Sequence, residues 1–536
     1  MSETTSKQAP KPGAKHAFDW LIVGLVLSVV VIIAAARHVG FYSVPERGTP
    51  VSSLQIDVAR PPGTLDPRFN SGSVSARIDE LVYASLVRVD ARGNFVGELA
   101  QSFERPTPTT IVFHLRHGLR FSDGRPLLAR DVKYTYDSIL DPANHSPKRA
   151  ALKALASIAA PDDTTVVMKT ARPCGPALEM ATVGVVPYGT PPPGKDTMRQ
   201  PAASGPFQIA RFARDESVVL ARNPYRGHAQ GKVAEIVFKV VPNPTVRALE
   251  LIQGVCDLAE NNIQPGLLGY LAMRPDLVVD KTPGTRYFRL VFNFRNLHLR
   301  DLRVRRAIAY TLDRQLIVSS LYKGDGRLAT GMLSPENWAY DGSVTKYHFD
   351  GVKVLSLLDK AGYPAQANGL RKLSFVYETT PEGKKLGDTM KKMLRRAGIR
   401  VEIHTDKPAT FRNYIRHGKF DLFSSQWDGI NDPREYYLLF DSKMVPPDGD
   451  NSGGYSNPAM DRLLEADNAT LSSAARRKIY ARVQELAAKD LPTLPLWWLD
   501  NIVVLNRRVK GFIPYPDGSL RSLRNVSLAQ PDNQAR

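Results

Sequence analysis

The chain has 536 residues, too many for one compact core, so we expect two or three domains. A hydrophobic share of 43% and a charged share of 23% are typical of a soluble globular protein and exclude a disordered chain. The formal net charge of +19 favours an anionic lipid surface or an acidic partner.

The N-terminus predicts a membrane contact. Residues 1–18 are a polar tail, and residues 20–36 are an uncharged apolar run within a segment that we place at residues 19–36. A cleaved signal and a retained transmembrane anchor both remain open, because the run is short for a spanning helix and ends in three alanines. The lysines of the long tail favour the anchor with a cytoplasmic tail. Either way the body of the protein is exported.

Residues 109–140 predict a strand, a turn and a helix. Apolar side chains alternate along residues 111–115, Gly118 permits a turn, and Asp123 and Gly124 form a second turn pair. Asp131 stands where the N-cap of a helix over residues 132–140 belongs. No enzyme motif requires this arrangement.

The middle of the chain contains a proline-rich loop and two cysteines. Residues 186–193 read as a surface loop. Cys174 and Cys256 are the only cysteines, and the sequence leaves open whether they form a disulfide or are two unrelated buried thiols.

The C-terminal half predicts helices and parallel strands. Asp301 is a candidate N-cap for one helix through residue 322. A strand at residues 373–377, a helix at 382–397 and a strand at 399–403 form a βαβ unit. A helix at 411–417 and a strand at 420–427 follow, so we expect a mixed or parallel sheet covered by helices.

Many short motifs together carry a family resemblance. They occur in one order over about 450 residues and comprise GTLDP at 63–67, ELA at 98–100, LRHGLRFSDGRP at 115–126, ARDV at 129–132, GPF at 205–207, RNPY at 222–225, GVCDL at 254–258, FN at 292–293, LRVRRA at 302–307, AGYP at 361–364 and LPTLPLWW at 491–498. The chain thereby resembles the family 5 extracellular solute-binding proteins of ABC importers, the oligopeptide- and dipeptide-binding group.

The resemblance implies a fold. It is an α/β, two-lobed periplasmic-binding-protein fold (type II, cluster C-like) with an extra subdomain in lobe one. Lobe one would comprise residues 51–89, 203–285 and 501–524, the subdomain residues 90–202, and lobe two residues 286–499.

The resemblance also implies where a ligand binds. In peptide-binding relatives a Trp and a turn with an acidic residue precede Asp-Pro, and here Trp427, Asp428, Asn431 and Asp432 occupy this segment. A carboxylate there pairs with a ligand ammonium group, but Ile430 stands close to the usual acidic position. For Asp432 the alternative is a turn cap before Pro433, and for Trp427 it is core packing.

Further ligand contacts are expected from each lobe. In lobe one they come from the loop that contains Phe69 and Ser71, and in lobe two from Tyr377, at the end of a strand.

The function that the resemblance implies is peptide capture for an ABC importer. The protein would work in the periplasm, tethered to the cytoplasmic membrane through residues 20–36, and would pass di- or oligopeptides to permease subunits. A non-peptide solute, or a sensor or chaperone-like role without an importer, is the alternative. We expect no enzyme activity, cofactor or metal, because phosphate-loop, HExxH and GxSxG motifs are absent and the histidines are scattered. We expect no nucleic-acid binding, because the basic clusters are dispersed.

Overall fold

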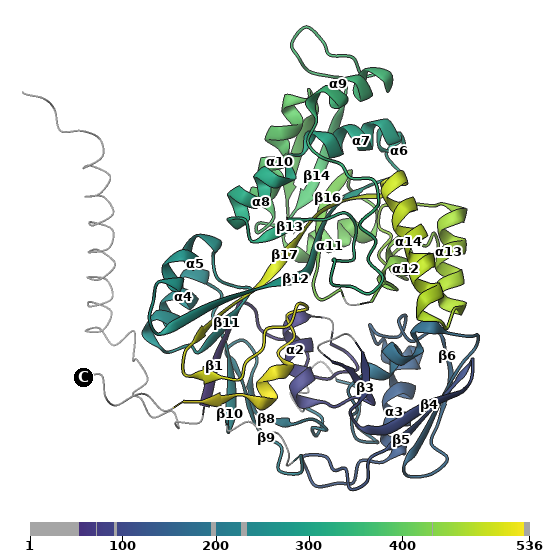
Figure 1. Cartoon of the computed structure of the whole chain (residues 1–536), viewed down its shortest axis with the longest axis vertical. Helices are drawn as coiled ribbons and strands as arrows, with labels where there is room; N and C mark the ends of the chain where they lie inside the picture. Colours follow the sequence, from purple (N-terminus) through teal and green to yellow (C-terminus); the bar gives the residue numbers. More distant parts are fainter. Residues whose placement is uncertain are drawn as a thin grey trace, which may run out of the picture. The chain divides into compact units, whose positions relative to one another are not determined.

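The computed structural model describes residues 53–70, 72–90, 94–193, 200–226, 233–430 and 432–529. The residues from Ser52 onward form one compact unit, whose described part is coloured in Figure 1. The predicted membrane segment, residues 19–36, lies outside the described residues. In the described ranges, no helix is both long enough and apolar enough to cross a membrane.

One eleven-stranded sheet runs through the unit. Its strands follow in the spatial order β15 (Arg400–Thr405), β14 (Ser374–Thr379), β16 (Leu422–Trp427), β12 (Leu277–Phe292), β17 (Thr493–Asn506), β11 (Leu258–Glu260), β1 (Ser53–Val58), β10 (Glu235–Val240), β9 (Ser217–Arg222) and β8 (Phe207–Ala213), while β13 (Gly326–Leu328) pairs with β17. Strands β15, β14 and β16 are parallel to one another, whereas β12 and β17 are antiparallel.

The long strands β12 and β17 join the two halves of the sheet, and Figure 1 shows them side by side between the halves. They pair at residues 277–282 with 501–506 and again at residues 286–291 with 493–499, with a register shift between the two stretches. Gly284 lies in this interruption, and a Cβ atom there would be 2.2 Å from the carbonyl oxygen of Leu499. We call the half with β1 and β8–β11 lobe one, and the half with β13–β16 lobe two.

Lobe one has helices on its sheet. They are α2 (Ser73–Val82), α4 (Pro244–Gln253), α5 (Pro265–Ala272) and the 3-10 helix η3 (Arg521–Asn525), and a small pair of strands, β18 (Val509–Lys510) and β19 (Ser527–Leu528), follows β17 in the chain. Helix α4 begins where the side chain of Asn243 accepts hydrogen bonds from two backbone amides, and it ends at Gly254 in the left-handed conformation.

Lobe two is richer in helices. They are α6 (Leu297–Arg300), α7 (Leu302–Thr311), α8 (Arg314–Tyr322), α9 (Gly351–Lys360), α10 (Lys384–Arg396), α11 (Pro408–Arg416), α12 (Glu435–Phe440), α13 (Pro458–Ala469) and α14 (Ser473–Asp490). One core joins α7–α10 to the sheet and contains Leu290 and Phe292 of β12. A second core includes Tyr287 from β12 and residues of α12–α14.

A separate sheet and core form between β1 and β8. The sheet has the order β4 (Ala100–Thr107), β5 (Thr110–Leu115), β7 (Thr165–Thr170) and β6 (Leu155–Ala159), and the hairpin β2 (Val87–Val89) with β3 (Phe95–Gly97) precedes it. Helix α3 (Ala129–Leu140) and the 3-10 helices η1 (Pro142–Asn144) and η2 (Gly175–Thr182) belong to the same region. Its core contains Phe113 and Tyr136, and it touches lobe two where Arg434 donates a hydrogen bond to the carbonyl of Ala151.

The structure confirms the predicted βαβ unit. Strands β14 and β15 are parallel and flank α10, whose buried side includes Leu386, Met390 and Met393. Gly398 follows in the left-handed conformation that a glycine adopts without strain. Strand β16 then returns parallel to β14, as predicted.

Two helix predictions were wrong in detail. Helix α3 begins at Ala129, so Asp131 is in its first turn, where its side chain accepts hydrogen bonds from the amides of Leu128 and Tyr188. The helix predicted from Asp301 is two helices, because the backbone is extended at Leu312 and Asp313 then caps α8. Asp301 itself caps α7 as expected.

The two cysteines are free and buried. Cys174 belongs to the core around α3, and Cys256 to a small core under α4 and α5. They therefore do not form the disulfide that the sequence had left open.

Candidate functional site

A cavity of about 430 Å³ lies where the two lobes meet. Arg60, Asn261, Ile263, Pro265 and Ile502 line it from lobe one, and from lobe two and the joining strands it is lined by Arg286, Phe288, Tyr322, Asp325, Tyr377, Thr379, Thr380, Glu382, Gly383, Leu386, Phe411, Ser424, Ser425, Gln426 and Leu499. Pockets of this size accommodate small organic ligands. The lining is apolar on several sides and polar along the ends of β14 and β16.

Beyond Phe423, strand β16 has no strand partner on its β14 side among the described residues. Its pairing with β14 includes Leu422 and Phe423, and the residues from Ser424 to Gln426 line the cavity instead. On the other side the strand remains paired with β12 through Trp427. Backbone amides and carbonyls at an unpaired strand edge are free to bind another extended chain.

Tyr377 lies at the lobe-two wall of the cavity. Its hydroxyl donates a hydrogen bond of 2.7 Å to the hydroxyl of Ser424, and burial raises the pKa of Tyr377 to about 12. The phenol therefore stays protonated at neutral pH and holds Ser424 in place.

Arg286 is the central charged group of the site. It lines the 430 Å³ cavity and also a small neighbouring cavity that Asp428, Arg77 and Asn501 help to form. Its Nε atom is buried without a hydrogen-bond partner. Burial lowers the pKa of Arg286, although the carboxylate of Asp428 opposes this effect.

Trp427 and Asp428, although adjacent in the chain, have different surroundings. Gln426 lines the 430 Å³ cavity, and Asp428 lines the small neighbouring cavity. The side-chain amide of Gln426 donates a hydrogen bond of 2.7 Å to Asp428. The ring of Trp427 instead packs on the second lobe-two core, with the guanidinium of Arg289 at 5.3 Å from its centroid. A ligand contact of Trp427 stays a prediction.

Asp432 is held in a turn beside lobe-two helices. One carboxylate oxygen accepts a hydrogen bond of 2.6 Å from the backbone amide of Arg434, and the other is buried without a partner. Burial raises the pKa of Asp432 to about 6. Asp432 does not line the cavity, and Asn431 lies outside the described residues.

The predicted lobe-one contacts are not part of the cavity wall that the structure describes. Phe69 is partly buried, with the guanidinium of Arg68 at 5.2 Å from its ring centroid. Ser71 lies outside the described residues. The structure therefore brings Tyr377 and Asp428 together around Arg286, and it leaves Phe69, Trp427 and Asp432 outside the lining.

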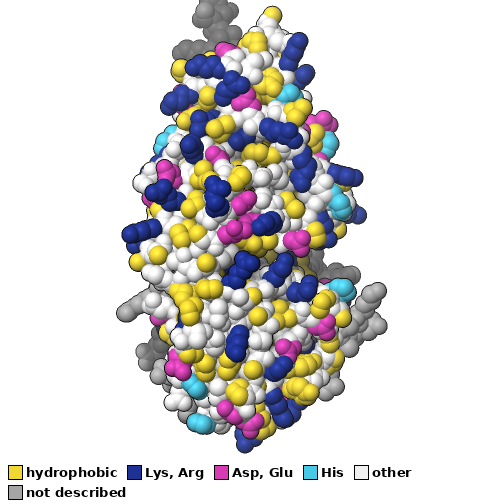
Figure 2. All heavy atoms as spheres, turned by 90° about the vertical axis from the view of Figure 1, so that its right-hand side faces the viewer, with side chains coloured by type: hydrophobic (Ala, Val, Ile, Leu, Met, Phe, Trp, Pro, Cys, Tyr) yellow, Lys and Arg dark blue, Asp and Glu magenta, His cyan; other side chains and the backbone are white. Residues whose placement is uncertain are grey.

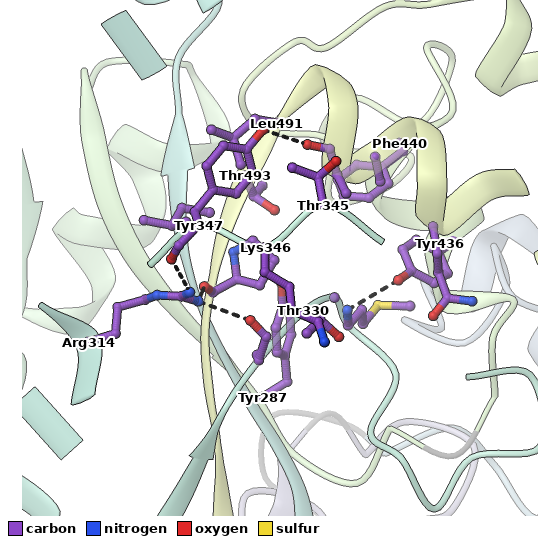
Figure 3. A pocket seen from close by; sticks show the side chains of 18 residues that line it. Tyr287, Arg314, Thr330, Thr345, Lys346, Tyr347, Tyr436, Phe440, Leu491 and Thr493 are labelled. Atoms are coloured by element: carbon purple, nitrogen blue, oxygen red, sulfur yellow. Dashed lines mark hydrogen bonds between the residues drawn. The ribbon is translucent and has the colours of Figure 1, made fainter. Parts of the chain in front are cut away.

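A second, smaller pocket lies inside lobe two. Its volume of about 20 Å³ is enough for about one water molecule. Figure 3 shows Arg314 extending to it, and its guanidinium donates hydrogen bonds to the carbonyls of Ala329 and Tyr347. All lining residues come from lobe two and the joining strands, so this pocket does not connect the lobes.

The cationic surface has no single stripe in the view of Figure 2. Lys and Arg side chains are scattered over this face between apolar and acidic side chains. Within the ranges that the structure describes, no group of three or more His, Cys, Asp or Glu side chains is placed to hold a metal ion.

Sequence reasoning missed the hinge residues Arg286 and Gly284 and the rim residues Arg60 and Glu382. A signal for Arg286 existed, since two arginines interrupt the otherwise apolar run TRYFRLVF at residues 285–292. Charged residues in a buried strand indicate either a salt bridge or a ligand contact. The rim pair gave no signal, because its two residues are far apart in the sequence.

Comparisons with known proteins give one consistent result. The model of the bacterial extracellular solute-binding proteins, family 5 (Middle), matches residues 94–444. A curated relative, the "Probable D,D-dipeptide-binding periplasmic protein DdpA" of Escherichia coli (strain K12), is 26% identical over 495 residues, which are 89% of this chain and 94% of that protein.

Solved structures share the fold. The oligopeptide-binding protein AppA of Bacillus subtilis, in complex with a nonapeptide, has a TM-score of 0.80 at 20% identity and covers 89% of this chain and 99% of its own. NikZ of Campylobacter jejuni, in complex with Ni(L-His), has a TM-score of 0.80 at 22% identity, with 89% and 100% covered. The predicted two-lobed α/β fold is thereby confirmed.

Proposed function

Since this chain belongs to the bacterial extracellular solute-binding proteins of family 5, we propose that it is the solute-binding component of an ABC importer and captures short peptides between its lobes. The observation that carries this proposal is the 430 Å³ cavity, which both lobes line and which contains the free edge of β16. The peptide-binding names of the relatives DdpA and AppA agree with it.

The free strand edge favours a peptide over other solutes. An extended peptide pairs with such an edge through its backbone, whatever its side chains are, and the apolar wall then receives the side chains. The wall offers Phe288, Tyr322, Leu386 and Phe411 for this purpose. Asp428, which lines the small neighbouring cavity, is the candidate partner for the ammonium group of the peptide.

Capture requires movement of the lobes about β12 and β17. A ligand that contacts both lobes stabilises the closed state more than the open state, whereas a ligand bound to one lobe cannot drive closure. The closed protein would then deliver the peptide to the permease subunits. No covalent step is involved.

The N-terminal segment would keep the protein at the membrane. Its apolar run at residues 20–36 supports a cytoplasmic-membrane anchor with the body on the periplasmic side. Alkaline extraction of membranes from producing cells tests this: an anchored protein stays in the pellet, and a cleaved one is released and has lost the mass of the N-terminal segment.

Native mass spectrometry of the purified full chain tests the binding function. The spectra are recorded for co-purifying ligand, and again after partial unfolding, refolding and addition of a peptide mixture. Bound peptides support the proposal. A different bound molecule keeps the transport role and replaces the substrate, and no bound species with no shift on adding peptides contradicts peptide capture.

A further inference from the structure

We propose that a groove between α7 and α9 of lobe two binds the phosphate-bearing headgroup of an anionic lipid. The groove has a volume of about 410 Å³, and Figure 1 shows its two helices toward the end of lobe two that is far from lobe one. None of the residues that line the groove lines the cavity between the lobes. The inference therefore goes beyond peptide capture and does not depend on it.

Helical spacing brings three cationic side chains to this groove. On α9 it is lined by Lys353, Ser356 and Lys360, which are three and seven positions apart and so share one face of the helix. On α7 it is lined by Arg306 and Tyr310, which are four positions apart. Among the described residues, no Asp or Glu side chain lines the groove, so the groove favours an anion.

Lys353 is held at the groove by two contacts. Its ammonium forms an ion pair of 3.0 Å with Asp350, and it lies 5.2 Å from the ring centroid of Tyr310. The other carboxylate oxygen of Asp350 accepts a hydrogen bond of 3.0 Å from the backbone amide of Lys353. An ammonium has three N–H donors, so these contacts leave donors for an anion in the groove.

Arg306 and Lys360 supply positive charge that no carboxylate neutralises. In the part of the chain that the structure describes, no ion pair joins either side chain to an acidic residue. The guanidinium of Arg306 donates a hydrogen bond of 3.2 Å to the carbonyl of Lys489, and its hydrogen bond to Tyr347 opposes the rise in the pKa of that phenol on burial. A guanidinium held by neutral oxygens keeps its charge for a ligand.

Two acidic residues of α9 and of the start of α7 are engaged with other cations. Asp359, which precedes Lys360, forms an ion pair with Arg371, and Asp301, which caps α7, forms one of 2.7 Å with Arg303. These carboxylates are therefore not free to fill the groove in place of a ligand.

The groove also contains hydroxyl groups. Tyr310, Thr345 and Ser356 line it together with the three cations. A phosphate group has more acceptor oxygens than a carboxylate, so it can use several cations and hydroxyls at once. A volume of about 410 Å³ is in the range of sites for small organic molecules and leaves room for the rest of a headgroup.

Exposed apolar side chains beside the groove favour a lipid as the source of the phosphate. Phe349, Val352 and Leu355 are exposed at 59%, 82% and 50%, and the last two are three positions apart on α9, on either side of Lys353 and Val354. Apolar side chains next to basic ones on a helix are typical of contact with an anionic membrane surface. The net charge of +19 agrees with such a surface.

Native mass spectrometry of the full chain in mild detergent tests the site. The anionic probe is dihexanoyl phosphatidylglycerol, the zwitterionic probe is dihexanoyl phosphatidylcholine, and the soluble probe is glycerol phosphate. We expect the phosphatidylglycerol to bind about tenfold more tightly than either of the others, because it alone offers both an uncompensated anion and apolar chains.

Two variants change the groove in different ways. Lys353→Gln with Lys360→Gln removes two cations and should weaken binding of the phosphatidylglycerol about tenfold. Ser356→Asp keeps all three cations but places a carboxylate among them, and it should cause a similar loss. The changed side chains are exposed, so the variants should fold, and thermal unfolding of each checks this.

A matched control removes the same charge elsewhere in lobe two. Lys391→Gln with Lys392→Gln changes two exposed lysines of α10 that do not line the groove, and it should preserve binding of the phosphatidylglycerol. Binding of a peptide mixture should be the same in all variants, because the groove is separate from the cavity between the lobes. If the double lysine variant of the groove does not fold, Ser356→Asp decides.

Loss of binding in the groove variants with retention in the α10 control supports the inference. An equal loss in the groove variants and the control overturns it, because net charge alone would then explain the binding. Binding that persists in both groove variants also overturns it, since the lipid must then lie elsewhere on the chain. Equal affinity for glycerol phosphate and phosphatidylglycerol overturns the lipid assignment, and no binding of either probe by the parent overturns the site itself.

Discussion

Arg60 and Glu382 form an ion pair of 3.8 Å between the two lobes, at the rim of the shared cavity. Arg60 follows β1 of lobe one, and Glu382 precedes α10 of lobe two. Both side chains are well exposed, at 73% and 62%. The pair therefore contributes little to folding but joins groups that separate when the lobes open.

Breaking this ion pair should speed ligand release. Glu382→Gln is expected to raise the dissociation rate of a bound peptide by up to about fivefold, with the melting temperature unchanged, since exposed ion pairs contribute at most about 1 kcal/mol. Stopped-flow measurements at low and high salt check this, and the effect should shrink at high salt. Asp388→Asn breaks the exposed Lys384–Asp388 pair of α10 outside the cavity and should leave the rate unaltered. A similar acceleration in both variants would contradict a role in closure.

Asp428 should distinguish peptides with a free ammonium group from N-acetylated peptides. Asp428→Asn, alone or with Asp432→Asn, is expected to weaken binding of a free peptide about tenfold and to leave binding of the N-acetylated peptide unchanged, because only the charged amine pairs with the carboxylate. Calorimetric titration of both peptides measures this. An equal loss for both peptides would point to a structural role of the turn.

Asp57 should make stability depend on pH. It is buried on β1 with one carboxylate oxygen unpartnered, and burial, followed by the charge of Glu250, raises its pKa from 3.8 to about 7. The folded chain holds this proton more tightly than the unfolded chain, so the stability it contributes is present below about pH 4 and is lost as pH rises to about 7.

The asparagine variant isolates this effect. From about pH 5 to about pH 8 the parent should lose about 3 kcal/mol of unfolding free energy relative to Asp57→Asn. Urea unfolding at several pH values provides the measurement, and Asp137→Asn, an exposed change on α3, is the control. A constant difference between parent and Asp57→Asn would show that Asp57 titrates normally.

Gly284 should tolerate no side chain. A Cβ atom there would approach the carbonyl oxygen of Leu499 to 2.2 Å and the amide nitrogen of Asn501 to 2.8 Å, so the two joining strands would have to separate. Gly284→Ala is expected to cost about 2 kcal/mol or more of unfolding free energy. Gly63→Ala, where nothing lies within 4 Å, is the control for denaturant unfolding. Equal stability of the two variants would exclude close strand contact at the hinge.

The thiols should be available only after unfolding. Cys174 and Cys256 are free and buried, and burial raises the pKa of both. We expect two reactive thiols per chain in denatured, unreduced protein and almost none in the native state. A thiol reagent with an absorbing product gives both counts, and a denatured protein without reactive thiols would require the disulfide after all.

Local patterns predicted much of lobe two. The βαβ unit of β14, α10 and β15 follows from an alternating strand, an apolar repeat and Gly398, all of which act over a few residues. The break at Asp313 was missed because the apolar repeat continues across it. Asp131 was misplaced by one helical turn, since an acidic residue suits both the N-cap and the first turn.

The candidate site was less predictable from sequence. Asp428 was named from a motif position and Tyr377 from its place at the end of a strand, and the structure places Tyr377 in the cavity wall and Asp428 in the small neighbouring cavity. Phe69 and Trp427 lie outside the lining of the cavity, and their ligand contacts stay predictions, because a motif fixes the position of a residue in the chain and not the side to which it points. Arg286 could be identified only from the structure, which shows that its Nε atom is buried without a hydrogen-bond partner.

The sequence by itself determined the family and the succession of most strands and helices. It also determined that the positive net charge is dispersed along the chain and does not come from one motif. These properties depend on residues close together in the chain or on the order of motifs along it. Only the tertiary structure decided that the cysteines stay apart, that Arg60 meets Glu382, and that Arg286 lies unpaired between the lobes. The cysteines stay apart because they lie in two different cores. The other two findings depend on β12 and β17, which bring residues more than two hundred positions apart into contact within one sheet.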